Sequence, residues 1–173
     1  RDVVTCSSGV SACGKGGHWW FALHLVCHLS SQTVRSNSIM CGSLMEACNR
    51  ADWRTTLTCL AEAVCTGVVA DTVMTNLAVH ASAVGLRWAD ALLLFNGATR
   101  STAPRAAMFA TALLACAKGR QWSEALVLLR MMQEAGLRLN AILYGASVDA
   151  CAQAGRWDWA LWLLREMRRE GIP

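Results

Sequence analysis

One pair among the four histidines has the spacing that metal sites use. His24 and His28 lie four residues apart in a segment expected to be helical, which would place both imidazoles on one face. Neither is followed or preceded by a glutamate, as the helical zinc-protease motif requires. The sequence therefore favours a packed or surface pair of histidines, and we expect no metal site.

The nine cysteines raise the same question, and their spacing argues against both ligation and disulfides. No Cys-x-x-Cys pair occurs anywhere in the chain. Four cysteines and one serine instead occupy one recurring place, five or six residues before a tryptophan: Cys13, Cys48, Ser82, Cys116 and Cys151. Such a place requires a small, weakly polar side chain, so we interpret these residues as packing between helices. Reduced thiols fit an intracellular or organelle-interior compartment.

Catalytic patterns are absent from the sequence. It contains no phosphate-binding glycine loop, no paired acid cluster and no nucleophile elbow, so we expect neither enzyme activity nor a cofactor. The hydrophobic share of 54% excludes a disordered chain, and the net charge of +4 is compatible with a polyanionic partner. The longest uncharged segment, 18–34, contains three histidines and several other polar residues, so no membrane span is predicted.

The elements that position these residues are set by a regular series of tryptophans. The intervals between successive members are 34, 35, 34 and 35 residues, and the members are Trp19, Trp53, Trp88, Trp122 and Trp157. A fixed period of this size is typical of a solenoid, whose long concave face holds an extended partner. The predicted fold is an all-α, right-handed superhelical solenoid of helix-turn-helix hairpins in one domain, 3–173.

The period divides the chain into five units, each predicted to form two helices. The units are 3–37, 38–71, 72–105, 106–140 and 141–173. First helices are expected at 6–15, 41–50, 75–84, 109–118 and 143–152, and second helices at 19–29, 53–65, 88–98, 122–135 and 157–167. Each period-marking tryptophan opens a second helix, where we expect it to fill the seam between neighbouring units; base stacking is the alternative.

The unit resembles the pentatricopeptide repeat, a family of helical-hairpin RNA binders common in plant and algal organelles. The segment 144–157, YGASVDACAQAGRW, is similar to that family's first helix and turn. The segment 160–173, ALWLLREMRREGIP, is similar to its second helix and closing pattern. The main competitor, the tetratricopeptide repeat, usually binds proteins and places Trp and Leu-Gly early in the first helix, whereas here the tryptophan opens the second.

The resemblance implies that each unit reads about one base with its fifth and last residues. Carried over, the base-reading pairs are Ser7 with Asn37, Gly42 with Asp71, Asn76 with Arg105 and Ala110 with Asn140, while Gly145 stands alone. Only Ser7 with Asn37 resembles a recognised pairing, one that favours adenine. Because Gly42, Ala110 and Gly145 offer no polar side chain, we expect weak or shape-based selectivity.

The resemblance also implies two further sets of RNA contacts. The second residue of each unit would clamp bases: Val4, Ile39, Val73, Ala107 and Ile142. Four of these five are β-branched and stiff, and the alternative is that they are core residues at a helix start. Basic residues near the end of three first helices would contact phosphate: Lys15, Arg50 and Lys118. The alternative for these is favourable interaction with the helix dipole.

These implications lead to a functional hypothesis. We expect single-stranded RNA binding in organelle RNA processing, stability or translation, in a chloroplast or mitochondrion, although no targeting segment is visible. The alternatives are a protein-binding scaffold, with a protein partner in the same groove, and the targeting arm of a larger RNA-modifying enzyme. Neither a membrane nor a small-molecule substrate is expected as a partner.

Overall fold

The computed structural model describes residues 8–13, 16–30, 38–49, 52–101 and 106–172. All regular secondary structure in these ranges is helical, which confirms the predicted all-α class. After the helical residues 8–13, the helices are α2 (Trp19–Ser30), α3 (Ser38–Asn49), α4 (Trp53–Cys65), α5 (Thr72–Val84), α6 (Trp88–Ser101), α7 (Ala106–Lys118), α8 (Trp122–Glu134), α9 (Ala141–Gln153) and α10 (Trp157–Arg169).

Each second helix begins at its period-marking tryptophan, as predicted. The first helices α3, α5, α7 and α9 begin two or three residues earlier than the sequence patterns indicated. The reason is visible at α5 and α9, where a polar residue caps the helix. The Asp71 carboxylate accepts a hydrogen bond from the Met74 amide at 2.9 Å, and the Asn140 amide oxygen accepts from the Leu143 amide at 3.0 Å.

The turns inside the hairpins share one backbone hydrogen bond, which is accepted at the position of the recurring Cys or Ser. The residue just before each tryptophan donates its amide hydrogen to the carbonyl of that Cys or Ser: His18 to Cys13, Asp52 to Cys48, Arg87 to Ser82, Gln121 to Cys116 and Arg156 to Cys151. In four of these turns the backbone two residues before the tryptophan has positive φ, at Gly17, Leu86, Arg120 and Gly155. This is the hydrogen-bonded end typical of a helix that stops on a left-handed residue.

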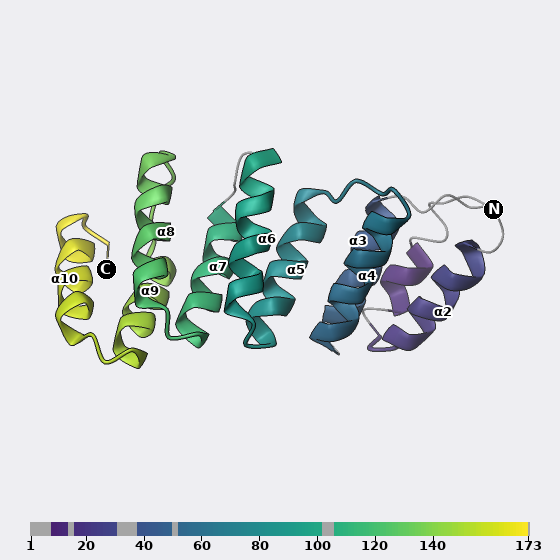
Figure 1. Cartoon of the computed structure of the whole chain (residues 1–173), viewed down its shortest axis with the longest axis horizontal. Coiled ribbons are helices and arrows are strands. Elements are labelled where there is room, and N and C mark those ends of the chain that lie inside the picture. Colours follow the sequence, from purple (N-terminus) through teal and green to yellow (C-terminus); the bar gives the residue numbers. More distant parts are fainter. Residues whose placement is uncertain (1–7, 14–15, 31–37, 50–51, 102–105, 173) are drawn as a thin grey trace. The chain divides into compact units, whose positions relative to one another are not determined.

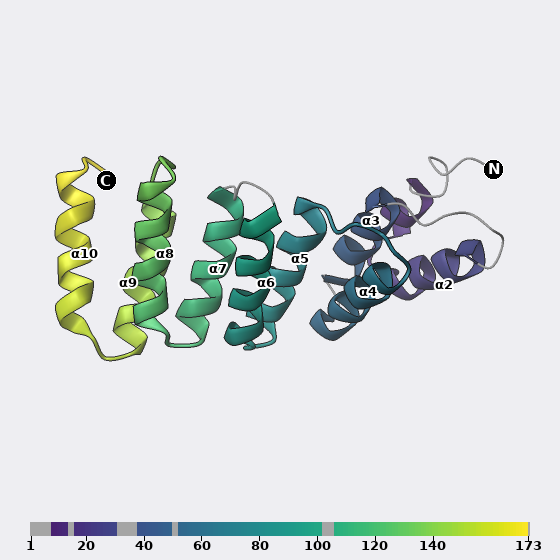
Figure 2. The same cartoon turned by 45° about the horizontal axis from the view of Figure 1, so that its top comes forward.

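The chain divides into two compact units, Arg1–Ala81 and Ser82–Pro173. In the second unit, α7 packs on α6, α8 and α9, and α9 packs on α7, α8 and α10. The first helices of successive hairpins, α7 and α9, therefore lie side by side. The second helices α6, α8 and α10 pack against them (Figures 1 and 2). The core of this unit includes an edge-to-face pair, Phe95 and Phe109, whose ring centroids lie 5.0 Å apart.

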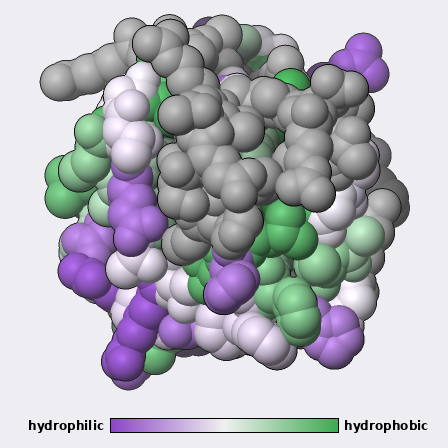
Figure 3. Space-filling view, turned by 90° about the vertical axis from the view of Figure 1, so that its right-hand side faces the viewer, coloured by the Kyte–Doolittle hydropathy of each residue, from purple (hydrophilic) through white to green (hydrophobic). Residues whose placement is uncertain are grey.

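In the first unit, α3 packs on both α2 and α4. Its buried residues include Met40 and Met45, and Met74 of α5 is buried as well. At the end that carries α2, apolar surface lies beside strongly polar surface (Figure 3). Trp20 and Phe21 contribute exposed apolar side chains to α2, with ring centroids 4.3 Å apart. No helix in the described ranges is long and apolar enough to cross a bilayer.

Four of the five small residues before the tryptophans are buried as predicted, whereas Cys13 is only half-buried. Cys48, Ser82, Cys116 and Cys151 are fully buried between helices. Burial raises the pKa of Cys116 to about 12, so this thiol stays protonated and unreactive at neutral pH. The packing interpretation of the recurring cysteines is confirmed at these positions.

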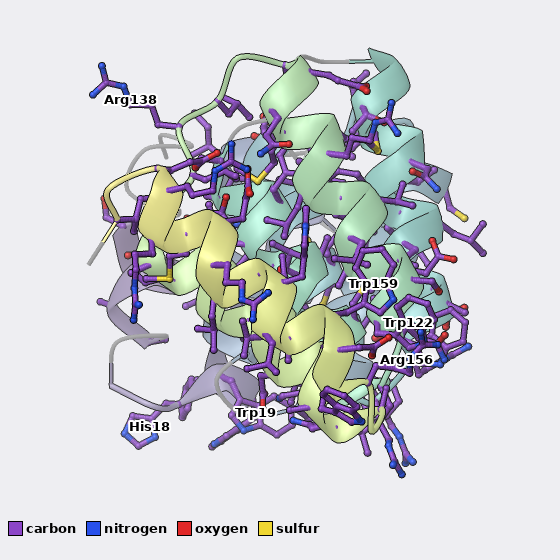
Figure 4. The ribbon with its side chains drawn as sticks, turned by 90° about the vertical axis from the view of Figure 1, so that its left-hand side faces the viewer. His18, Trp19, Trp122, Arg138, Arg156 and Trp159 are labelled. Atoms are coloured by element: carbon purple, nitrogen blue, oxygen red, sulfur yellow. The ribbon has the colours of Figure 1, made fainter. Side chains whose placement is uncertain are left out.

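The tryptophans fill seams in the second unit, as expected, at Trp88 and Trp122. Trp88 lies directly against the backbone of Gly119 in the turn of the next hairpin. Trp122 stacks on Trp159 of the next hairpin with ring centroids 6.0 Å apart, and the Arg156 guanidinium lies 4.2 Å from the centre of the Trp122 ring (Figure 4). Trp157 departs from this prediction, because its side chain is 73% exposed in the fifth hairpin.

Candidate nucleic-acid interface

The first helices of the second unit present one face to solvent. On α9, the exposed residues Ile142, Gly145, Asp149 and Gln153 recur at helical spacing and share one stripe. The opposite stripe, which includes Leu143, Tyr144, Ser147, Ala150 and Cys151, is buried. The sequence of α9 is apolar almost throughout, so packing against α7, α8 and α10 decides which face is left to solvent.

The neighbouring helix α7 presents a matching stripe. Ala107, Leu114 and Lys118 are exposed, and Ala110 is half-buried at the same spacing. Since α7 and α9 pack directly on each other, the two stripes form adjacent rows of one surface. Equivalent residues of the two rows, such as Ala107 and Ile142, come from the same place in successive hairpins.

The first unit contains the same pattern on α3 and on the part of α5 that belongs to it. Ile39 and Glu46 are exposed on α3, and Val73 is exposed on α5 with half-buried Asn76 and His80 at helical spacing from it. Asn49 lies near the end of α3. Its Nδ2 atom is 3.1 Å from the Nδ1 atom of His80. This contact ties together the ends of two first helices.

The residues predicted to clamp bases had an alternative interpretation as core residues. The exposure of three of these side chains excludes that alternative. The side chains of Ile39, Val73 and Ile142 are 65%, 61% and 74% exposed. Ala107 is exposed as well, while Val4 lies outside the described residues. A large apolar side chain at the same solvent-facing place in three hairpins is therefore a surface feature, and the interpretation of these residues as core is wrong.

The predicted base-reading residues have different environments. Gly42 is buried and faces Met74, Ala110 and Asn76 are half-buried, and Gly145 is exposed with open space around it. Asp71 and Asn140 are helix caps, so one oxygen of each side chain is held by a backbone amide. The Asn140 NH₂ group takes no part in that cap and retains its two donors. Three further members, Ser7, Asn37 and Arg105, lie outside the described residues.

Of the predicted phosphate contacts, only Lys118 can be placed. It is exposed in the last turn of α7, on the same stripe as Ala107 and Leu114. The alternative explanation was a favourable interaction of the lysine with the helix dipole, and a position in the last turn suits that explanation as well. The location of Lys118 therefore does not separate the two explanations. Lys15 and Arg50 lie outside the described residues.

The stripes contain a row that sequence reasoning had overlooked. The ninth residues of the second to fifth hairpins lie on these stripes: Glu46, Leu114 and Asp149 are exposed, and His80 is half-buried. The Asp149 carboxylate accepts a hydrogen bond from the Gln153 amide at 2.8 Å. The row follows the same period as the tryptophans, so aligning the units would have found it. Glu46 in the first unit and Asp149 in the second each make the surrounding stripe unfavourable for phosphate.

The two histidines with metal-like spacing can be followed in part. His24 is exposed on α2, and the side chain of His28 lies outside the described residues. Within the described ranges, no group of three or more His, Cys, Asp or Glu side chains is arranged to hold a metal ion.

The cluster of basic residues at the end of α10 is solvent-exposed. Arg165, Arg168 and Arg169 all face solvent. Arg169 pairs with Glu166 at 3.1 Å, with the arginine side chain 78% exposed. An ion pair this exposed contributes little to stability, and its charges are compensated locally.

Comparison with known proteins identifies the repeat. The family profile described as PPR repeat, the pentatricopeptide repeat, matches residues 108–137 and 143–172. These two matches cover most of the fourth and fifth hairpins. A sequence search of curated proteins finds no match.

Solved structures share the fold over the whole chain. The pentatricopeptide repeat protein PPR10 from maize is 23% identical with a TM-score of 0.80, over 100% of this chain and 25% of that protein. The PPR domain of Arabidopsis thaliana protein-only RNase P 1, solved in complex with tRNA, is 14% identical with a TM-score of 0.82, over 96% of this chain and 89% of that one.

A third similar structure is the nuclear proteinaceous RNase P 2 from A. thaliana, at 17% identity and a TM-score of 0.79, over 97% of this chain and 39% of that protein. The chain thus spans a quarter of the length of PPR10 and well under half of this RNase P. Residues 108–137 and 143–172 thus match the pentatricopeptide repeat at the predicted period, and the all-helical array of hairpins has the fold of solved pentatricopeptide repeat proteins.

Proposed function

We propose that this chain binds single-stranded RNA across the exposed stripes of its first helices. The observation that carries the proposal is the row of solvent-exposed, β-branched side chains at the start of α3, α5 and α9. Leaving such side chains in water costs free energy, which a flat apolar partner would recover. Nucleobases offer such a face, and their polar edges would meet the fifth and last residues of each hairpin.

Electrostatics and the family comparisons support the same proposal. The net charge of +4 favours a polyanion, and Lys118 lies at one edge of the α7 stripe. PPR10 has been solved with an 18-nt psaJ RNA element, and the RNase P 1 domain with tRNA. The same similarity extends to a nuclear protein, so the fold is compatible with more than one compartment.

The finer part of the proposal concerns process and place. We place the activity in organelle RNA processing, stability or translation, in a chloroplast or mitochondrion, because that is where the family is common. The chain would act by position, since a bound strand is hidden from other factors or presented to them. As the targeting arm of a longer protein, the same surface would bring RNA to a modifying enzyme.

The first experiment is selection from a random single-stranded RNA pool on the purified chain at two salt concentrations. Enrichment of a short motif that weakens with salt supports RNA binding. Adenine at one fixed place would assign the register of Ser7 and Asn37. A folded chain that retains no RNA at low salt would contradict the proposal and favour a protein partner on the same surface.

Variants of the exposed row test the surface itself. Val73→Ser and Ile142→Ser should each lower RNA affinity about threefold to tenfold, the range expected for losing one apolar contact to a base. Leu93→Ser is the matched control, because Leu93 is 70% exposed on the second helix α6, away from the stripes. If Leu93→Ser weakens binding as much as the other two variants, the exposed row is not the binding surface.

The basic residues are tested by salt dependence. Replacing Lys15, Arg50 and Lys118 together by alanine should lower the slope of log affinity against log salt by about two, at roughly 0.7 per phosphate contact on a single strand. A triple variant with an unchanged slope would assign these residues to helix-end stabilisation instead.

A further inference from the structure

The second helices α8 and α10 leave a cavity between them on the side away from the first-helix stripes. Both helices pack on α9, and they meet each other through the stacked rings of Trp122 and Trp159. The cavity has a volume of about 410 Å³, which lies within the range of small-ligand sites. Its walls are mainly apolar, with contributions from Leu126, Leu129 and Leu163.

Two tryptophans and a tyrosine give this cavity an aromatic corner. Trp159 and Trp162 meet edge to face, with ring centroids 5.7 Å apart and an angle of 76° between their planes. Trp159 is held in place by its stacking on Trp122, while Trp162 is 49% exposed. Rings at a near-right angle leave no parallel slot for a flat base, but they enclose a compact group on two sides.

Tyr144 of α9 supplies an unpartnered polar atom beneath this corner. The residue is 1% exposed and lines the cavity, and its hydroxyl makes no hydrogen bond of good geometry among the described residues, while the Glu170 carboxylate lies close enough to interact with it. A buried hydroxyl without a partner costs free energy that a ligand would recover by bonding to it. Burial, together with the nearby carboxylates of Glu170 and Glu166, raises the pKa of Tyr144 to about 12.

The charges around the cavity favour a cation. Arg130, which lines it, is paired with Glu134 at 3.0 Å, and Glu166 is paired with Arg169 at 3.1 Å. These two pairs are each neutral. Glu170 is not itself a lining residue but acts on the Tyr144 hydroxyl, and its described partners are uncharged: that hydroxyl and the Gln133 amide at 3.4 Å. One carboxylate beside the hydroxyl thus lacks a neutralising cation, and aromatic faces also attract positive charge.

The aromatic residues are particular to this seam and do not follow from the repeat. Trp159 stands where the other hairpins have Phe21, Thr55, Asp90 and Glu124, and Trp162 stands where they have His24, Thr58, Leu93 and Val127. Tyr144 is the only tyrosine in the chain, and its equivalent in the fourth hairpin is the buried Phe109. Packing of the array alone therefore does not require this combination.

We propose that the cavity between α8, α9 and α10 binds a primary ammonium group carried on an apolar stem. The ammonium donates a hydrogen bond to the Tyr144 hydroxyl oxygen and faces Glu170, while the stem lies against Trp159, Trp162 and the leucines. Free amines and the lysine side chain of a partner protein share this chemistry. The site uses α8, α10 and the buried face of α9, whereas the RNA proposal uses the exposed stripe of α9, so either proposal can fail alone.

The test measures binding of n-butylammonium by chemical-shift changes of the tryptophan indole groups. Two probes remove one feature each: 1-butanol lacks the charge, and butyltrimethylammonium lacks the N–H donors. We expect millimolar binding of n-butylammonium and binding of 1-butanol that is about 2-fold to 30-fold weaker, the range of cation–π interactions. An acetylated and amidated Gly-Ser-Lys-Ser-Gly peptide separates the two sources, because tighter binding than the free amine would indicate a partner's side chain.

Three variants connect the binding to the cavity. Trp162→Val introduces the residue of the fourth hairpin and should abolish the preference for n-butylammonium over 1-butanol. Tyr144→Phe should lower n-butylammonium binding to the level of butyltrimethylammonium, and the buried Phe109 indicates that phenylalanine fits this place. Trp157→Val is the matched control on the same helix outside the cavity, and its binding should equal that of the unmodified chain.

Two outcomes would overturn the proposal. One is equal or tighter binding of 1-butanol, which would make the cavity a simple apolar site. The other is unchanged n-butylammonium binding in Trp162→Val, with far-ultraviolet circular dichroism confirming that the variant is folded. A chain that binds no probe at tens of millimolar would exclude the site as well.

Discussion

The contact between Gly119 and Trp88 makes a sharp prediction about how successive hairpins are held together. A β-carbon added at Gly119 would lie 2.6 Å from the Cγ and Cδ1 atoms of Trp88 and 2.7 Å from its Cβ atom. Carbon atoms pack at about 3.5–4.0 Å, so Gly119→Ala creates an overlap of about 1 Å. The obstructing atoms lie at the root of the tryptophan side chain, where a rotamer change cannot remove all of them.

We expect Gly119→Ala to lower the free energy of unfolding by about 2 kcal/mol, within the range for overpacked sites. For a chain of this length the transition temperature would fall by about 4–8 °C. Gly97→Ala is the matched control, because Gly97 lies inside α6 and a β-carbon there meets no atom within 4 Å. The free energy of unfolding of that variant should rise by about 0.5–1 kcal/mol, because alanine favours the helix more than glycine does. The same Gly→Ala change therefore stabilises the chain at one position and destabilises it at the other.

The assay is urea unfolding followed by circular dichroism, with hydrogen exchange of α6 and α8 to locate the loss, because repeat arrays unfold in segments. A double-mutant cycle isolates the clash: in a Trp88→Ala background, Gly119→Ala should cost almost nothing. If Gly119→Ala unfolds at the same denaturant concentration as the unmodified chain, or at a higher one, the proposed packing of Trp88 on the next turn is wrong.

Three further predictions concern caps, turns and ionisation. Asn140→Ala should lower the free energy of unfolding by about 1 kcal/mol, because it removes the cap of α9. Asn140→Asp should retain stability but remove the amide donors from the RNA surface. Comparing the two variants therefore separates an effect on stability from an effect on RNA affinity. Leu86→Gly should raise stability by about 1 kcal/mol in thermal unfolding, because Leu86 is exposed with a φ of 58° and the equivalent Gly17 and Gly155 adopt this conformation without strain. The pKa of Tyr144 is raised to about 12 in the folded chain. Its contribution to stability should therefore be complete below pH 10 and disappear as the pH rises from 10 to 12. Tyr144→Phe should lack that loss when unfolding is measured at alkaline pH.

Much of the fold could be predicted from the sequence because the period is regular. The tryptophans mark the start of each second helix, and the Cys or Ser before them marks the end of each first helix. The starts of the first helices were predicted too late, because their caps, Asp71 and Asn140, lie beyond the apolar pattern that was used to place them. A helix can begin wherever a side chain satisfies its first amides, and that choice is local.

The candidate surface was harder to predict than the hairpins that carry it. Ile39, Val73 and Ile142 are apolar, and composition alone suits the core as well as an exposed stripe. On α9 the polar residues Asp149 and Gln153 mark the exposed stripe, but only the packing of neighbouring helices decides that Ile142 is left to solvent with them. The resemblance assigned these residues to a surface, which agrees with their exposure, whereas hydrophobicity did not distinguish the alternatives. The role of the surface remains a proposal that RNA binding must test.

Residues that recur with the period serve the fold of this chain, whereas residues that interrupt the period are candidates for function. A residue that recurs in every hairpin, such as the buried Cys or Ser, is explained by the need to close a turn and pack two helices. A residue that interrupts the pattern has no such explanation, and Trp159, Trp162 and Tyr144 interrupt it together around one cavity. Because the other hairpins fold without these side chains, their equivalents provide substitutions that should preserve the fold. The chain therefore contains its own controls, and exchange of residues between hairpins can test the RNA surface and the ammonium site separately.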